Sequence, residues 1–190
     1  MAREIQVAIW VVLAVALAIS VVTDLRTRKI LNIVTFPTIA LCLALRLAAG
    51  LRGGDFWGPA VGGVGLASGL VGMAVSGILF FVMAAMGGMG MGDVKLAAAV
   101  GAGVGFPAVL PCLVFTGVAG GIEALVVLAW RRKLLEALGS MARSALQKVR
   151  RVNDDPSPRE RTKIPYGVAI AAGTVWGVLW MASQTAPTPP

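Results

Sequence analysis

Three acidic residues lie in or beside the long apolar segments of this chain: Asp24, Asp93 and Glu123. An ionisable side chain is costly to bury in a membrane, so each of them is a candidate for function. Asp24 ends the first apolar segment and Asp93 follows the third. An even number of membrane crossings separates the two, which predicts that both carboxylates lie at the same face of the membrane.

Two carboxylates at one site can activate water without a metal or a covalent intermediate. Two carboxylates a few ångströms apart share one proton, because ionising both of them is costly. The ionised member then takes a proton from the attacking water, while the protonated member hydrogen-bonds the scissile carbonyl oxygen. The chain has no histidine, which excludes His-based triads and most zinc sites. We therefore expect neither a metal nor a cofactor, and we interpret Cys42 and Cys112 as core residues because they form no CxxC pair.

Each acidic residue also has a structural interpretation. Asp24 can be a boundary charge that pairs with Arg26 or Arg28. Asp93 can cap, or lie in the first turn of, the helix that follows it. Glu123 has one interpretation only, a structural hydrogen bond inside the bundle.

The elements that position these residues are membrane spans. The chain is 57% hydrophobic and its mean hydropathy is +0.84, well above the values of a soluble domain. We predict an all-α polytopic membrane protein with one membrane-embedded domain, residues 1–190. Its six transmembrane helices are expected near residues 5–23, 33–50, 59–86, 93–106, 107–130 and 165–184. Close helix packing is predicted at the small-residue pairs Gly65/Gly69, Gly101/Gly105 and Gly117/Gly121.

The distribution of basic residues predicts the orientation. With both termini outside, the inner segments hold fourteen of the seventeen Lys and Arg residues, as the positive-inside rule requires. Only Arg3, Arg46 and Arg52 remain outside. This explains the net charge of +8 without nucleic acid as a partner. The basic cytoplasmic loop 131–163 is either a solvated loop or, in its first part, an amphipathic helix on the membrane surface.

Three motifs contain these candidate residues. They are DLRTRKILN at residues 24–32, GMGDVKL at residues 90–96, and KIPYG at residues 163–167. In this order they resemble the type IV prepilin peptidase family of GxGD membrane aspartyl proteases, over nearly the whole chain. The resemblance implies an aspartic endopeptidase with Asp24 and Asp93 as the catalytic pair. Supporting roles are expected for six further residues: Asn32, Gly90, Gly92, Lys95, Pro165 and Gly167.

The resemblance also implies the partners and the location. The substrate would be a prepilin or pseudopilin, with a short basic leader that ends in glycine before a hydrophobic helix. The enzyme would be a multi-pass protein of the cell inner membrane, embedded in the lipid bilayer with its active site facing the cytoplasm. Longer family members carry paired CxxC motifs and methylate the new amino terminus. Because this chain lacks those motifs, it looks like the peptidase-only form found with Flp/Tad-type pili, and we expect no methyltransferase activity.

Two non-enzymatic functions stay open from the sequence. A proton-coupled carrier could use Asp24 and Asp93 as a relay, and a pilus assembly scaffold would need neither carboxylate. A carrier requires a carboxylate near the bilayer midplane on a path open to both sides. The predicted position of both aspartates at one face favours the protease.

Overall fold

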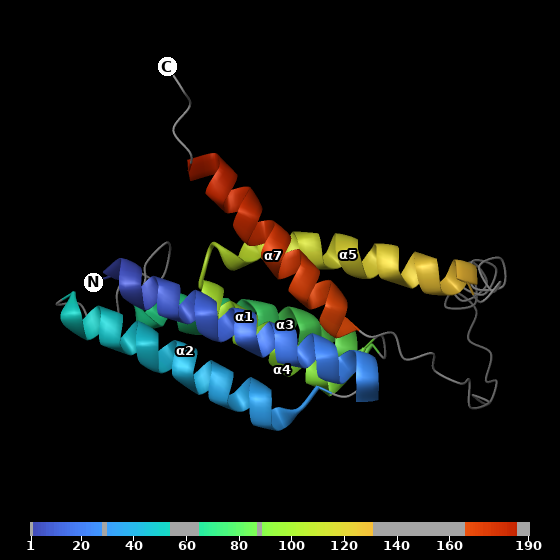
Figure 1. The fold of residues 1–190 in the computed structure, drawn as a ribbon, viewed down its shortest axis with the longest axis horizontal. Helices are drawn as coiled ribbons and strands as arrows, with labels where there is room; N and C mark the ends of the chain where they lie inside the picture. The colour runs from blue at the N-terminus through green and yellow to red at the C-terminus, as the bar shows by residue number, and fades with distance from the viewer. Residues whose placement is uncertain (1, 28–29, 54–64, 87–88, 131–165, 186–190) are drawn as a thin grey trace, which may run out of the picture.

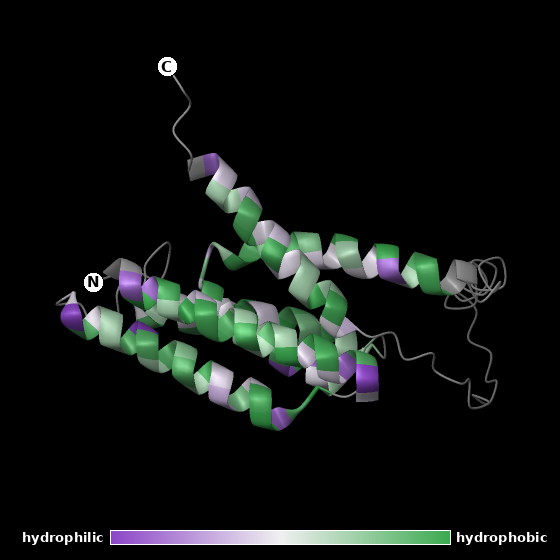
Figure 2. Ribbon diagram, viewed as in Figure 1, coloured by the Kyte–Doolittle hydropathy of each residue, from purple (hydrophilic) through white to green (hydrophobic). Residues whose placement is uncertain are grey.

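The computed structural model describes residues 2–27, 30–53, 65–86, 89–130 and 166–185. Throughout these ranges the regular structure is helical. The helices are, in order, α1 (Ala2–Thr27), α2 (Asn32–Arg52), α3 (Leu66–Ala85), α4 (Met91–Val104), α5 (Val109–Trp130) and α7 (Tyr166–Thr185). All of them except α4 are long and apolar enough to cross a membrane, and Figure 2 shows their hydrophilic residues mostly near the helix ends. The predicted all-α, multi-pass membrane protein is confirmed.

The helix bounds refine the predicted spans. Helix α1 continues to Thr27, so Asp24 lies in its last turns and not after its end. The predicted break between 93–106 and 107–130 is confirmed, because α4 ends at Val104 and α5 begins at Val109. Gly105 adopts a positive φ of 78° at this break, a conformation that glycine adopts without steric cost. The predicted start of the third span at residue 59, the loop 131–163 and Pro165 lie outside the described residues.

Helix α4 lies inside the bundle. It has 14 residues and is therefore about 21 Å long, shorter than a hydrocarbon core of about 30 Å. Nearly every residue from Asp93 to Val104 is buried. Its most extensive partner is α3, which it approaches so closely that a Cβ on Gly72 or Gly101 would collide with the other's backbone. Small residues permit this approach.

The predicted glycine pairs differ in their packing. Gly101 and Gly105 are both in tight contact, as expected, and so is Gly69. Gly117 and Gly121 are different, because a Cβ on either would meet no described atom within 4 Å. The prediction that this third pair packs a neighbouring helix closely is therefore wrong for the part of the chain that the structure describes.

Arg46 has a structural role that the charge count did not predict. Its side chain is only 1% exposed, and it donates from Nε to the Ala102 carbonyl (2.8 Å) and from Nη2 to the Gly103 carbonyl (2.7 Å). The last carbonyls of a helix have no partner within the helix. Because α4 ends inside the bundle, those carbonyls need a buried donor, and α2 supplies one. Arg46 is thus not an exposed topology charge.

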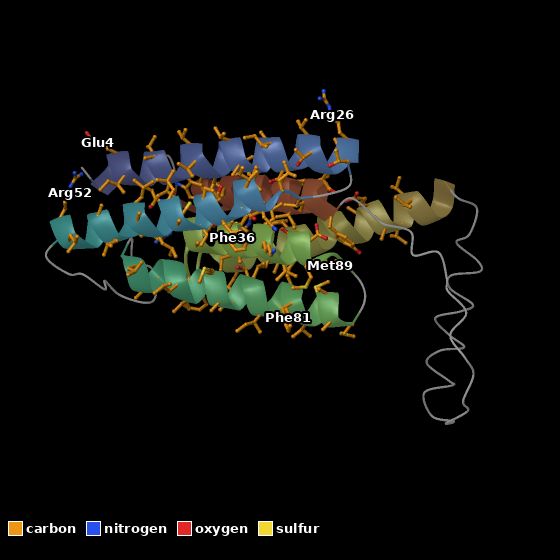
Figure 3. All side chains as sticks on the ribbon, turned by 90° about the horizontal axis from the view of Figure 1, so that it is seen from below. Glu4, Arg26, Phe36, Arg52, Phe81 and Met89 are labelled. Atoms are coloured by element: carbon orange, nitrogen blue, oxygen red, sulfur yellow. The ribbon has the colours of Figure 1, made fainter. Side chains whose placement is uncertain are left out.

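The helix ends decide which residues can meet. Figure 3 shows Glu4 and Arg52 at one end of the bundle and Arg26 at the other. Helix α5 packs mainly on α7, and α7 also contacts α1 and α4; in Figure 1 α7 crosses α5. The end of α1 and the beginnings of α4 and α7 therefore come together at the Arg26 end.

Candidate functional site

Asp24 is held by the first turn of α7. Its side chain is 5% exposed, and Oδ2 accepts a hydrogen bond of 2.9 Å from the backbone N–H of Gly167. Gly167 is the second residue of α7, so its N–H is one of those that have no acceptor within the helix. The positive end of a helix dipole also favours a carboxylate here. The alternative ion pair with Arg26 is not formed, and Arg28 lies outside the described residues.

Asp93 is held by the beginning of its own helix. It is 8% exposed and lies in the first turn of α4, after the N-cap residue Gly90. Its Oδ2 accepts from the Gly90 N–H over 3.0 Å, and its own N–H donates to the Gly90 carbonyl over 3.1 Å. Asp93 therefore occupies the first-turn position that the sequence allowed.

The fold brings Asp24 and Asp93 to one site. Their carboxylates interact electrostatically, although the residues come from helices far apart in the sequence. Each carboxylate is held at Oδ2 by the backbone N–H of a glycine. Neither Oδ1 accepts a hydrogen bond from any described residue. In each carboxylate, Oδ2 is thus fixed by the protein, whereas Oδ1 remains able to bind water or substrate.

Two glycines make room for the surrounding chain. A Cβ on Gly167 would lie 2.7 Å from Asp24 Oδ2, closer than real contacts of this kind. A Cβ on Gly92 would lie 3.0 Å from the Cβ of Ile30. Glycine at these two positions lets the beginning of α7 reach Asp24 and lets Ile30 pack at the beginning of α4.

Lys95 and Asn32 contact each other and not the aspartates. Lys95 Nζ donates to Asn32 Oδ1 over 2.9 Å and lies 5.0 Å from the centre of the Phe36 ring. A cation at this distance is attracted by the negative face of the ring. The two residues therefore join the beginning of α2 to the first turns of α4, next to Asp93.

Two further residues belong to the electrostatic surroundings of the pair. Glu123 interacts with both Asp24 and Asp93, and Tyr166 interacts with Asp93 and Glu123. Glu123 Oε2 is buried and has no hydrogen-bond partner among the described residues. The hydrogen bond predicted for Glu123 is therefore not found at this oxygen. Glu123 received no other role from the sequence, although an isolated acid in an apolar helix is a signal that could have indicated one.

The described residues contain no group of three or more His, Cys, Asp or Glu side chains placed to hold a metal ion. Cys42 and Cys112 are free thiols, both buried in the bundle. The chemistry that the site offers is that of paired carboxylates.

A comparison with protein families matches residues 11–125 to the type IV leader peptidase family. The matched part is more than half of the chain and contains both aspartates and Glu123. The chain belongs to this family. No curated protein and no solved structure matches it. The match confirms the resemblance seen in the sequence, and it ends before α7, which supplies Gly167 to the site of this leader peptidase.

Proposed function

We propose that this leader peptidase is an aspartic endopeptidase in which Asp24 and Asp93 together activate water. Its substrates are prepilin-like proteins whose short leader is removed at the cytoplasmic face of the inner membrane. One observation carries the proposal. Two buried carboxylates at the same end of the bundle are each fixed at Oδ2 by a glycine N–H, while each Oδ1 lacks a partner among the described residues.

The chemistry follows from this arrangement. Two neighbouring carboxylates hold one proton between them because ionising both is costly. The ionised carboxylate takes a proton from the attacking water, and the protonated one donates a hydrogen bond to the scissile carbonyl oxygen. The tetrahedral intermediate then collapses as the leaving amine receives the proton that the first carboxylate took from water, which restores the starting state of the pair. The fixed Oδ2 atoms keep both groups oriented throughout, which lowers the entropic cost of the reaction.

The membrane face is proposed from the charge distribution. Arg26 lies at the same end of the bundle as the beginnings of α4 and α7, whereas Glu4 and Arg52 lie at the other end. The basic segments next to Asp24 and Asp93 favour the cytoplasmic side. A leader made on the ribosome is accessible at that side.

The carrier and the scaffold receive less support. Both aspartates lie near one end of the bundle, whereas a proton carrier needs a carboxylate on a path open to both sides. A scaffold for pilus assembly would tolerate the loss of either carboxylate, so the same experiment separates it from an enzyme.

The deciding experiment measures cleavage of a purified prepilin-like substrate by the full chain. Asp24→Asn and Asp93→Asn are each expected to lower kcat at least about a thousandfold, because asparagine neither accepts a proton from water nor shares one. Glu4→Gln, at the opposite end of the bundle, is the control. Membrane insertion is checked for each variant. Substantial turnover by either asparagine variant would falsify the two-aspartate mechanism.

We also propose that the enzyme does not methylate its product. The two cysteines are single residues buried in α2 and α5, and neither belongs to a CxxC pair. Mass spectrometry of the cleaved substrate is expected to find a free amino terminus after incubation with a methyl donor.

A further inference from the structure

An apolar groove runs along α7 between α1 and α5. Its main part has a volume of about 560 Å³ and is lined from α1 by Leu25, from α5 by Phe115, Val118 and Ile122, and from α7. A second hollow of about 470 Å³ continues it along α7 toward Val21 and Leu179. The two parts share Val168, Ala172 and Trp176. Volumes of this size are typical of binding sites.

The floor of the groove is one face of α7. Val168, Ala172, Val175 and Leu179 follow one another at helical spacing, so they form a continuous stripe. The side chains of Val175 and Leu179 are 54% and 64% exposed. Trp176 is 64% exposed and stacks on Phe115 with a centroid separation of 5.6 Å. The stripe extends over about three helical turns, or roughly 16 Å.

Among the described residues that line this groove, one is charged. Glu123 is on the α5 wall, and its charge interacts with Asp24 and Asp93. Its Oε2 is buried with no hydrogen-bond partner among the described residues. An uncompensated buried carboxylate is unfavourable, whereas a carboxylate that meets a cation is not. Asp24 and Asp93 add negative charge to the surroundings of Glu123, so a positive group balances an ionised Glu123 best.

We propose that this groove binds the hydrophobic helix of the substrate and that Glu123 binds a lysine or arginine side chain of the leader. The inference rests on the proposed function and names the specificity residue of that site. The apolar stripe on α7 is complementary to a hydrophobic membrane helix. Glu123 is complementary to a positive charge at the end of that helix. The groove is also lined by Leu25, which follows Asp24, and by Val168, which follows Gly167. The bound cation therefore lies close to the catalytic pair.

The charge contact is tested by a kinetic cycle on the full chain. The two substrates are a purified prepilin-like protein with one lysine in its leader and the same protein with glutamine in that place. With the lysine substrate, Glu123→Gln is expected to raise KM roughly tenfold with kcat nearly unchanged. With the glutamine substrate, Glu123→Gln and wild type are expected to have equal KM. Glu4→Gln is the matched control and should equal wild type on both.

The outcomes separate the inference from the function. If Glu123→Gln changes KM equally for both leaders, Glu123 does not bind the leader cation and the inference fails alone. If it lowers kcat on both leaders with no change in KM, Glu123 acts on the catalytic pair and the inference also fails. If wild type cleaves neither substrate, the proposed function fails, and the inference fails with it.

The occupant of the groove is tested by photo-crosslinking in phospholipid vesicles. A photoreactive benzoylphenylalanine replaces Trp176 in the groove or, as control, Phe81 on α3, which is 53% exposed and labelled in Figure 3. The substrate helix is expected to crosslink at position 176 and not at position 81. A product at 176 that contains only phospholipid, or only another segment of this chain, would show that the groove has a different occupant. Equal substrate crosslinking at both positions would show that contact is nonspecific.

Discussion

The backbone N–H of Gly167 donates to Oδ2 of Asp24 over 2.9 Å, although 143 residues separate the two in the sequence. This hydrogen bond connects the beginning of α7 to the last turns of α1. The second aspartate is held in the same way by a local glycine, Gly90. The orientation of Asp24 therefore depends on the packing of α7, whereas the orientation of Asp93 depends on its own helix.

Gly167→Ala is expected to disturb Asp24 directly. The new Cβ would lie 2.7 Å from Oδ2, so either the carboxylate or α7 must move. A displacement of about 1 Å at a catalytic group can lower the rate about a hundredfold, and we expect a fall of this size in kcat for leader cleavage. Gly117→Ala is the matched control, because its Cβ meets nothing within 4 Å. Equal activity of the two variants would contradict a positioning role for Gly167.

The double variant Asp24→Asn/Asp93→Asn is expected to be little worse than either single variant. Residues that act as one catalytic unit lose most of their effect when one of them is removed. The measurement is single-turnover cleavage of one prepilin-like substrate by the three variants at equal amounts of inserted enzyme. Losses that multiply would indicate two independent roles instead of one shared site.

Arg46→Met is expected to destabilise the bundle. The substitution removes the donors to the Ala102 and Gly103 carbonyls, and a buried acceptor without a partner costs about 1–3 kcal/mol. We expect a loss of about 3 kcal/mol, measured as a lower midpoint of thermal unfolding in detergent. Arg52→Met, at the exposed end of the same helix, should change the midpoint little. An unchanged midpoint for Arg46→Met would show that these carbonyls find other donors.

The two ends of the bundle are expected to label from opposite sides of the membrane. Single cysteines at Arg52 and Thr27, with Cys42 and Cys112 replaced by alanine, are treated with an impermeant maleimide. The cysteine at position 52 should react in spheroplasts, and the one at position 27 only after permeabilisation. Labelling in the reverse order would place the aspartates on the outer side and contradict the proposed orientation.

Much of the site was predictable because the signals are local in the sequence. Apolar runs predict membrane helices, since an unpaired backbone cannot cross a lipid bilayer. The break between α4 and α5 was predictable from Gly105 and Pro107, because both residue types interrupt a helix. The even number of predicted crossings placed Asp24 and Asp93 at one face, and the family match confirms the resemblance read from the motifs that contain them. Their catalytic role and the exact membrane topology stay predictions.

Other features depend on contacts between distant residues, which no local pattern records. Arg46 looked like an outer charge in the sequence, but α4 ends inside the bundle and its carbonyls require this donor. Gly117 and Gly121 have the same spacing as Gly101 and Gly105, yet only the latter pair faces a neighbouring helix closely. The sequence by itself determined which residues could do chemistry and at which end they lie. Only the tertiary structure decided which atoms hold Asp24, and that one oxygen of Glu123 has no hydrogen-bond partner among the described residues. Both facts arise from how α1, α5 and α7 pack together.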